Sequence, residues 1–287
     1  MILRSLLFIP GDSERKLAKG DASGADALIL DLEDAVAAQN KAAARALVAA
    51  FLAERPGQQR ASQLWVRVNP LDSGLIDDDL AAVIGGAPDG VMLPKCDGPD
   101  DVRALSVKLD QFGAAGTMIL PVATETALAP FRLGDYAGAG LSRLAGLTWG
   151  AEDLSAALGA STNRDERGEW AFTYQLVRSL TLLGAKAAGV AAIDTLYVDF
   201  RDDDGLRASS RVSRAEGFTG RLAIHPGQVA AINDSYLPSA AEIDHARRVI
   251  EAFAAAPGSG TVGLDGRMLD RPHLKQAEAV LAQAARV

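Results

Sequence analysis

The sequence predicts an α/β fold, a (β/α)8 TIM barrel with a C-terminal helical extension. Eight short apolar runs recur along the chain, and alanine-rich or amphipathic stretches of helical period separate them. Strands that alternate with helices pair in parallel through crossover connections. Eight such units within about 250 residues match the barrel in number and in length. The alternative is an open doubly wound sheet, whose first turn would carry G-x-G-x-x-G, whereas this chain has "PGDSERK" there.

The apolar runs are expected to form the eight strands. The last barrel helix is expected at 239–256, where Ser239 and Glu242 have the spacing of a capping box. Stretches such as 40–54, "NKAAARALVAAFLAE", are expected to be the helices between strands. The barrel domain is therefore predicted to span residues 1–256. In chain order the predicted strands cover residues 3–9, 26–32, 64–68, 90–93, 117–122, 144–149, 190–193 and 221–224.

A linker and a further helix follow the predicted barrel. Residues 257–263, "PGSGTVG", have the composition of a flexible linker. Pro272 suits the first turn of a final amphipathic helix. Such a helix must bury its apolar stripe, either over its own barrel mouth or over that of a neighbouring subunit. Residues 257–287 are therefore predicted to be a linker and a lid or oligomerisation segment, with a simple packing helix as the alternative.

Composition restricts the classes of partner and of compartment. The 37 acidic and 29 basic residues give a net charge of −8, which disfavours nucleic acid because phosphate binding needs a basic surface. No apolar run approaches the length of about 20 residues that a membrane helix needs. Cys96 is the only cysteine, so no internal disulfide can form, and a cytoplasmic protein is expected. Cys96 is interpreted as a buried thiol rather than as a nucleophile.

Polar or ionisable residues follow nearly every predicted strand. Enzymes with this fold build their active sites at the C-terminal ends of the strands. A single charged strand end is usually a solvated cap, but so many at one rim predict a functional site. In chain order these residues are Asp31, Glu33, Asp34, Arg67, Asn69, Lys95, Glu125, Glu152, Asp153, Asp194 and His225.

Glu125 and Asp153 are candidate metal ligands. They lie 28 positions apart, about one βα unit, so they are expected to end neighbouring strands, which are about 4.8 Å apart. Two carboxylates at that distance repel one another unless a proton or a cation lies between them. Mg²⁺ fits, because it takes one or two protein carboxylates and leaves other positions for water and substrate. The alternative is that Asp153 caps the helix that follows it.

Two basic residues at the predicted rim have two interpretations each. Arg67 either holds a substrate carboxylate in two-point fashion or pairs with an acid of the rim. Lys95 either forms a Schiff base or, as is favoured, a supporting salt bridge with Glu33 or Asp34. Zinc is disfavoured because the chain has one cysteine and three histidines without ligand spacing.

Nine motifs, in this order along nearly the whole chain, resemble one known family. They are "RSLLFIPGDSERK", "ALILDLEDAV", "KAAAR", "VRVNP", "GVMLPK", "GLTWGAEDL", "DFRDDDGLR", "GFTGRLAIHPGQV" and "GRMLDRPHLKQA". They are similar to the CitE-like branch of the HpcH/HpaI aldolase superfamily. The resemblance implies a (β/α)8 barrel with Mg²⁺-dependent carbon–carbon lyase activity, Mn²⁺ being a substitute. It implies a CoA thioester such as malyl-CoA, citramalyl-CoA or citryl-CoA as substrate, acetyl-CoA and a 2-oxo acid as products, and a homotrimer or homohexamer.

The resemblance also implies roles for residues at matching motif positions. Glu125 and Asp153 match the metal ligands, and Arg67 matches a carboxylate-binding arginine. Asp270 matches a catalytic acid/base that often lies over a neighbouring subunit's site, and Asp265 is close enough to be confused with it. The positions that match contacts to the CoA thioester, or the channel around it, are Phe8, Arg15, Lys19, Ala223 and Ile224, and those that match a pair ordering the metal's waters are Glu33 and Asp34.

Two departures from a uniform family pattern affect the expected function. Phe8 stands where some members have tyrosine, so no hydrogen bond from that ring is expected. Short members lack the C-terminal segment, so its presence favours a free-standing CoA lyase. One alternative is a β-type subunit that acts on an acyl-carrier-protein thioester in a citrate lyase complex. Another is a metal-dependent pyruvate aldolase, against which Arg15 and Lys19 argue because they suit the phosphates of CoA. The released acid stays open among glyoxylate, pyruvate and oxaloacetate.

Overall fold

The computed structural model describes residues 3–57 and 60–285. The chain divides into two compact units, one from Leu3 to Asn233 and the other from Asp234 onwards. Within the described ranges, no helix is both long and apolar enough to cross a membrane.

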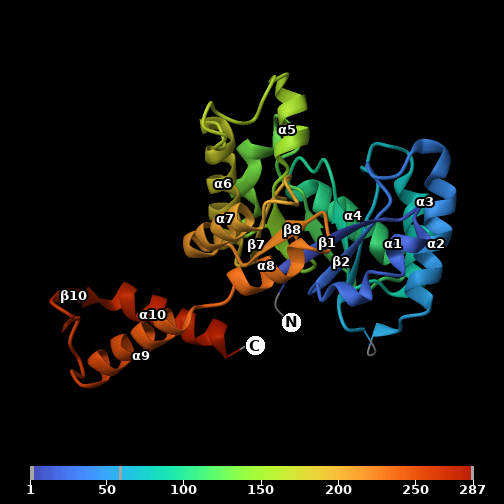
Figure 1. Ribbon diagram of the computed structural model, residues 1–287. Helices are drawn as coiled ribbons and strands as arrows, with labels where there is room; N and C mark the ends of the chain where they lie inside the picture. Colours follow the sequence, from blue (N-terminus) through green and yellow to red (C-terminus); the bar gives the residue numbers. More distant parts are fainter. Residues whose placement is uncertain (1–2, 58–59, 286–287) are drawn as a thin grey trace. The chain divides into compact units, whose positions relative to one another are not determined.

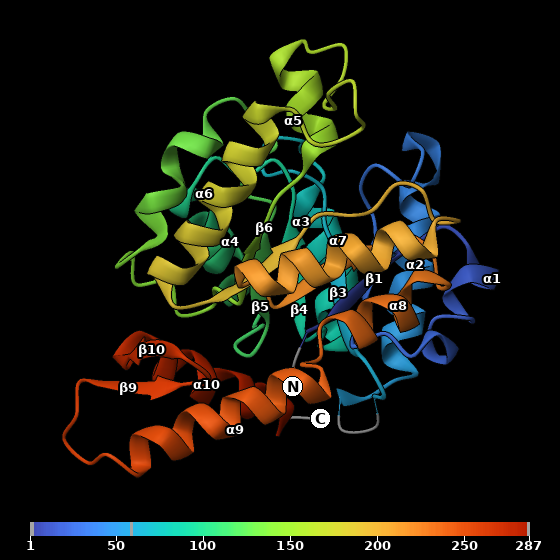
Figure 2. The same ribbon diagram turned by 60° about the vertical axis from the view of Figure 1, so that its left-hand side comes forward.

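The first unit is a barrel of eight parallel strands, which confirms the predicted fold class (Figures 1 and 2). Hydrogen-bonded neighbours follow the order β5-β4-β3-β2-β1-β8-β7-β6. Parallel bridges from Ile119 to Leu144 and from Val122 to Thr148 bring the two ends of this sheet together. The strands are β1 (Ser5–Pro10), β2 (Ala27–Asp31), β3 (Gln63–Arg67), β4 (Gly90–Leu93), β5 (Met118–Pro121), β6 (Gly146–Thr148), β7 (Ala191–Asp194) and β8 (Gly220–Ala223).

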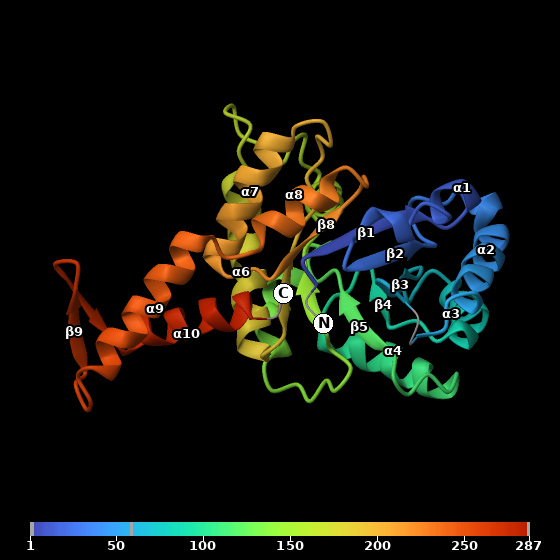
Figure 3. The same cartoon turned by 60° about the horizontal axis from the view of Figure 1, so that its bottom comes forward.

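Helices connect the strands on the outside of the barrel (Figure 3). α2 shows why they form, because its buried residues Ala44, Val48, Phe51 and Leu52 recur with a helical period and face the sheet side. A 3₁₀ helix, η5 (Ala129–Tyr136), follows β5. The α-helices of this unit are α1 (Glu14–Leu17), α2 (Lys41–Ala53), α3 (Ile76–Val83), α4 (Pro99–Gln111), α5 (Ala151–Leu158), α6 (Phe172–Ala188), α7 (Asp203–Glu216) and α8 (Gln228–Ser235).

The barrel interior is filled by side chains from most of the strands. Trp65 of β3 is the largest of them, and Gly90 of the neighbouring β4 makes room for it. A Cβ atom at Gly90 would lie 2.2 Å from the Trp65 ring, so only glycine fits there. The interior is thus a packed core that supports the strand ends from below. Its buried members are Leu6, Ala27, Ile29, Trp65, Met92, Leu120, Val122, Ile193 and Leu222.

The second unit contains α9 (Ala240–Ala254), a hairpin of β9 (Thr261–Leu264) and β10 (Arg267–Asp270), and α10 (Arg271–Ala284). The predicted capping box of Ser239 and Glu242 is present at the start of α9. This helix was expected to complete the barrel, with a boundary at 256, but the division falls between residues 233 and 234.

Apolar packing explains why α9 belongs to the second unit. Its residues Ala246, Val249 and Phe253 pack against Leu269 and Ala277 of the following hairpin and helix. The helix that follows β8 is the shorter α8. Part of the stretch expected as a linker, 257–263, is strand β9 rather than coil.

Candidate active site

A cavity of about 450 Å³ opens among the C-terminal ends of the strands, within the barrel unit. Every strand except β4 contributes to its wall, directly or through the loop that follows. The lining residues are Leu7, Phe8, Ile9, Pro10, Lys16, Lys19, Gly20, Asp31, Ala35, Arg67, Val122, Glu125, Trp149, Gly150, Ala151, Glu152, Asp153, Thr195, Leu196, Leu222, Ile224, His225 and Pro226.

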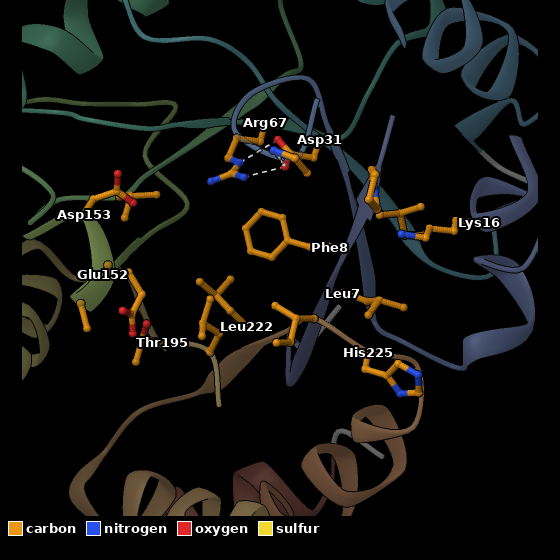
Figure 4. Close-up of a pocket in the computed structure, with 18 of the residues that line it drawn as sticks. Leu7, Phe8, Lys16, Asp31, Arg67, Glu152, Asp153, Thr195, Leu222 and His225 are labelled. Atoms are coloured by element: carbon orange, nitrogen blue, oxygen red, sulfur yellow. Dashed lines mark hydrogen bonds and ion pairs between the residues drawn. The ribbon is translucent and has the colours of Figure 1, made fainter. Parts of the chain in front are cut away.

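The cavity has an acidic end and a basic end on opposite sides of the Phe8 ring (Figure 4). Glu152 and Asp153 lie on one side of the ring, and Lys16 and His225 lie on the other. A ligand that spans the cavity therefore meets carboxylates at one end and basic side chains at the other.

Most of the residues predicted for the site meet at this cavity. Glu33, Asp34 and Lys95 are not in its wall. Glu33 pairs with Arg67 and Lys95 pairs with Asp153, both wall residues, and Asp34 pairs with Lys95. Ala223 is fully buried and Arg15 is exposed on α1, and neither lines the cavity. The predicted residues in the wall are Phe8, Lys19, Asp31, Arg67, Glu125, Glu152, Asp153, Ile224 and His225.

Glu125 is a buried carboxyl next to a second acid. Only 6% of its surface is exposed. Burial raises the pKa of Glu125 to about 8, and the negative charge of Asp153 adds to the rise. The backbone N–H of Lys95 donates to its Oε2 atom at 2.6 Å. The ionised form of Glu125 is therefore costly unless a cation lies beside it.

The donor set at the acidic end fits a hard divalent cation. Glu125 and Asp153 offer carboxylate oxygens. No group of three or more potential metal ligands occurs in the described part of the chain, so these two acids would be the protein's contribution to the site. Two protein carboxylates with the remaining positions left to water and substrate are typical of Mg²⁺. The capping alternative for Asp153 is not supported, because Gly150 is the N-cap of α5 and no side-chain capping bond is present.

Lys95 connects the acids behind the cavity wall. Its ammonium group forms ion pairs with Glu33, with Asp34 at 3.3 Å and with Asp153 at 3.5 Å. Burial works to lower the pKa of Lys95, but the hydrogen bond to Glu33 and the nearby negative charges outweigh it and raise the pKa. A lysine held in its protonated form is not a nucleophile. The favoured salt-bridge interpretation is confirmed, and a Schiff base at this position is disfavoured.

Arg67, at the end of β3, is held from three directions. Its Nε and Nη2 atoms donate to Asp31 at 2.8 and 2.6 Å, and Nη1 lies 3.0 Å from Glu33. Its guanidinium carbon lies 4.8 Å from the centre of the Phe8 ring. The alternative that Arg67 pairs with a rim acid is therefore correct. The two-point bond to Asp31 uses only part of the guanidinium, and hydrogens on Nη1 and Nη2 remain for a ligand.

Of the basic residues of the cavity, Lys16 was not predicted, and His225 was expected only as one of the polar residues at the strand ends. Lys16 lines it beside Lys19, because a short helix and turn follow β1 and place both lysines near one end. His225 lines it after β8 and stacks on Phe200, with ring centres 4.9 Å apart. Lys16 stands in the same "ERKLAK" stretch as Lys19, at a spacing of three, which is the signal that would have identified it.

Trp149 is a second feature that the sequence did not reveal. It is fully buried in the cavity wall, and its indole N–H donates to Asp194 at 2.7 Å. Its neighbour Gly150 leaves no room for a side chain, since a Cβ there would lie 2.8 Å from Glu125. The end of β6 is therefore fixed tightly against the Glu125 carboxyl.

Asp270 and Asp265 lie in the second unit. Asp270 is the N-cap of α10, and its Oδ1 atom lies 2.5 Å from Nδ1 of His273. Asp265 forms the hairpin turn with a positive φ of 51° and pairs with Arg248. The two carboxyls are therefore in distinct settings, one at a helix start and the other at a hairpin tip.

Solved structures similar to this chain share its fold. CitE from Mycobacterium tuberculosis, in complex with magnesium, acetoacetate and coenzyme A, is 33% identical, with a TM-score of 0.83 and coverage of 99% of this chain and 98% of that one. The same protein with magnesium and pyruvate is 31% identical, with a TM-score of 0.75 and 98% of each chain covered.

Curated relatives and a family model agree with these structures. (3S)-Malyl-CoA thioesterase of Cereibacter sphaeroides is 37% identical, over 98% of this chain and 94% of the relative. Mitochondrial citramalyl-CoA lyase of Mus musculus is 33% identical over 99% and 86%, and citrate lyase subunit beta of Escherichia coli is 36% identical over 98% and 93%. The model of the HpcH/HpaI aldolase/citrate lyase family matches residues 4–226, and the chain belongs to that family.

Proposed function

We propose that this protein is a Mg²⁺-dependent carbon–carbon lyase. Its substrate is a 3-hydroxyacyl-CoA thioester with a second carboxylate, such as malyl-CoA, citramalyl-CoA or citryl-CoA, which it cleaves to acetyl-CoA and a 2-oxo acid or forms from them. The observation that carries this proposal is the cavity itself, which joins the buried Glu125, the half-buried Asp153 and an arginine to two lysines about the Phe8 ring.

Glu125 and Asp153 would hold the Mg²⁺ ion, with Mn²⁺ as a substitute. The bound ion supplies stabilisation of negative charge on the hydroxyl oxygen of the substrate. Lys95 positions both ligands, because its N–H bonds to Glu125 and its ammonium group lies 3.5 Å from Asp153. Glu33 and Asp34 hold that ammonium group in turn.

Arg67 would orient the carboxylate of the substrate and the oxo group that emerges on cleavage. Its bond to Asp31 and its contact with Phe8 fix the plane of the guanidinium before a ligand arrives. A preorganised planar donor loses little entropy when it binds a carboxylate. Because Asp31 and Glu33 already neutralise part of its charge, Arg67 serves more to align the ligand than to attract it.

The basic end would hold the CoA portion. Lys16 and Lys19 line the cavity there and are exposed, as suits contacts with phosphates. Arg15, on the same short helix, extends the positive charge outside the cavity. Ile224 lines the channel, and the backbone of the buried Ala223 supports it.

Asp270 would move the proton. In cleavage its carboxylic acid protonates the enolate of acetyl-CoA, and in condensation its carboxylate removes a methyl proton. We expect Asp270→Asn to bind the thioester but to lose most turnover. Asp265→Asn is the matched control, because Asp265 is tied to Arg248 at the hairpin tip. Full turnover in Asp270→Asn would remove this residue from the mechanism, and loss in Asp265→Asn alone would transfer the role to Asp265.

The deciding experiment is acetyl-CoA release by the purified protein from malyl-CoA, citramalyl-CoA and citryl-CoA. Each reaction is run with Mg²⁺ and again with EDTA. Cleavage of one thioester that depends on the metal is expected, and it identifies the released acid. Cleavage that persists in EDTA would contradict the Glu125–Asp153 site. Acceleration by Mg²⁺ of hydrolysis without release of a 2-oxo acid would contradict the lyase activity.

A carrier-protein subunit is a second candidate, favoured by the 36% identity to citrate lyase subunit beta. The C-terminal segment does not separate the two functions, because that relative matches 98% of this chain. Activity on an acyl-carrier-protein thioester combined with none on CoA esters would favour this candidate. The reverse result would favour the free-standing lyase, and condensation of pyruvate with an aldehyde without CoA would favour an aldolase.

The proposal extends to assembly and compartment. We propose a homotrimer or homohexamer, in which the segment that carries Asp270 acts as a lid, and a cytoplasmic location for a chain with one buried cysteine. Light scattering after gel filtration tests the subunit number. Neither nucleic acid nor a membrane is needed as a partner.

A further inference from the structure

A second cavity in the barrel unit, of about 690 Å³, is lined by residues of α6 and α7. The loop before α6, the two helices and the segment after β7 form its wall. Leu196 lines both cavities, so the two adjoin. None of the residues assigned above to the lyase chemistry lines the second cavity, and it therefore needs its own explanation.

Two arginines in its wall share one buried carboxylate. Asp194 is fully buried and accepts from Arg178 at 2.9 Å and from Arg221 at 3.2 Å. The Arg221 side chain is only 4% exposed, and its Nε atom is buried without a hydrogen-bond partner. Arg178 has a second ion pair with the half-exposed Glu216, whereas Arg221 shares Asp194 as its one acidic partner among the described residues.

Arg164 adds a third guanidinium to the wall of the cavity. Its guanidinium carbon lies 3.3 Å from the centre of the Trp170 ring, and its one hydrogen bond is a 3.4 Å contact with the carbonyl of Gly168. In the part of the chain that the structure describes, Arg164 makes no ion pair. Burial lowers the pKa of Arg164, because the nearby charges of Glu152 and Glu169 do not outweigh the loss of water around this cation.

The acids of this cavity lie at its outside. Glu169 and Asp199 are exposed to solvent, and Glu216, 45% exposed, is already paired with Arg178. The inner surface is thus richer in donors than in acceptors, and Ser209, which accepts from Arg221, adds a hydroxyl to it. A buried surface of this kind favours an anion.

We propose that the cavity between α6 and α7 is a second binding site, and that it takes a small oxyanion, a carboxylate or a phosphate, through Arg164 and Arg221. Arg164 supplies the free charge, and the unpaired Nε of Arg221 supplies a buried donor. Planar guanidinium groups bind both kinds of oxyanion in two-point fashion. The site does not depend on the lyase activity proposed above.

Tryptophan fluorescence provides a direct measurement of binding. Trp170 lies beneath Arg164 and contacts Trp149 edge to face, with ring centres 5.2 Å apart, so an anion at Arg164 alters the surroundings of two of the three tryptophans. The full-length protein is titrated with malate and, separately, with inorganic phosphate, without metal or thioester and at constant ionic strength. We expect a saturable change with at least one of the two probes.

Two variants of the loop before α6 test the assignment. Arg164→Met removes the charge but keeps an unbranched apolar side chain over Trp170, and we expect it to weaken binding by about tenfold or more. Arg167→Ala is the matched control, because that arginine is 82% exposed, does not line the cavity and pairs only with Asp165. Its titration should equal that of the wild type. Unfolding of the free Arg164→Met variant at the same urea concentration as the wild type verifies that the barrel unit is still folded.

Each outcome either identifies the anion that binds or contradicts the proposal. Saturation with phosphate alone or with malate alone supports the site and identifies the group that it recognises. A response in Arg164→Met as strong as in the wild type would place binding elsewhere and overturn the proposal, as would a change that NaCl reproduces. Because no turnover is measured, absence of lyase activity would leave this result unaffected, and lyase activity would not support it.

Discussion

Replacing Glu125 by glutamine should remove a pH-dependent loss of stability from the metal-free barrel. The ordinary pKa of this carboxyl is 4.5, and burial next to Asp153 raises it to about 8. The folded state therefore binds a proton that the unfolded state has released at every pH between these values. Stability falls as pH rises through that window, because the folded protein must either keep the proton or bear a buried charge.

The size of the effect follows from the gap between the two pKa values. A gap of about 3.5 pH units corresponds to about 5 kcal/mol at about 1.4 kcal/mol per unit. At pH 8 the Glu125 carboxyl of the folded protein is itself half ionised. Between pH 6 and pH 8 the free energy of unfolding of the wild type should therefore fall by about 2 kcal/mol relative to that of Glu125→Gln.

Urea unfolding in EDTA, followed by tryptophan fluorescence, measures this difference. All three tryptophans, Trp65, Trp149 and Trp170, lie in the barrel unit, so the signal reports that unit alone. Glu152→Gln is the control, because that acid is exposed in the same cavity and should leave the pH dependence unchanged. Adding Mg²⁺ should stabilise the wild type more at pH 8 than at pH 6, because the metal replaces the proton. Equal pH dependence of the wild type and Glu125→Gln in EDTA would refute the argument.

Three further substitutions test other parts of the structure. Gly90→Ala places a Cβ within 2.2–2.5 Å of three Trp65 ring atoms and should lower the free energy of unfolding by about 1–3 kcal/mol, measured by urea titration. Although burial works to raise the pKa of Asp194, the charges of Arg221 and Arg178 lower it to about 2. Asp194→Asn should therefore cost at least about 2 kcal/mol at pH 7, a loss that shrinks as pH falls from 3.8 toward 2; a constant loss would contradict this. Arg67→Lys cannot form the two-point bond and should raise KM for the thioester about tenfold or more, with an unchanged KM as the contrary result.

Strand positions could be predicted from the sequence because each barrel strand is a short apolar run. The run at 90–93 coincides with β4, Gly90–Leu93, and the other strands agree within a few residues. The meeting of Arg67, Glu125 and Asp153 at one cavity followed from the rule that strand ends converge. This part of the site depends on topology alone, and the alternation of apolar strand runs with helical stretches in the sequence predicts that topology.

Pairing among like residues could not be predicted in the same way. Several acids follow β2, and only the structure shows that Asp31 takes the two-point bond from Arg67 while Glu33 and Asp34 hold Lys95. Which acid reaches which base depends on side-chain directions at the end of a closed sheet. The bond from Trp149 to Asp194 joins residues 45 positions apart and leaves no local pattern.

The C-terminal unit shows a different kind of error. The helical period at 239–256 correctly predicted α9, but a period does not state which surface buries the apolar face. The dipeptide Asp265–Gly266 was an overlooked hairpin signal, since both residues have a positive φ, 51° and 75°, as a tight turn between strands requires.

The left-handed backbone at Lys95, with a φ of 51°, has an evolutionary consequence. One residue there supplies both a main-chain N–H to Glu125 and a side-chain cation to three acids. Glycine would accept the backbone angle most readily but would lose the cation. Arginine would keep the charge but replace a compact ammonium group with a wider planar one. A single substitution of this lysine thus either removes the cation or changes its shape, and this position should change more slowly than its exposure suggests.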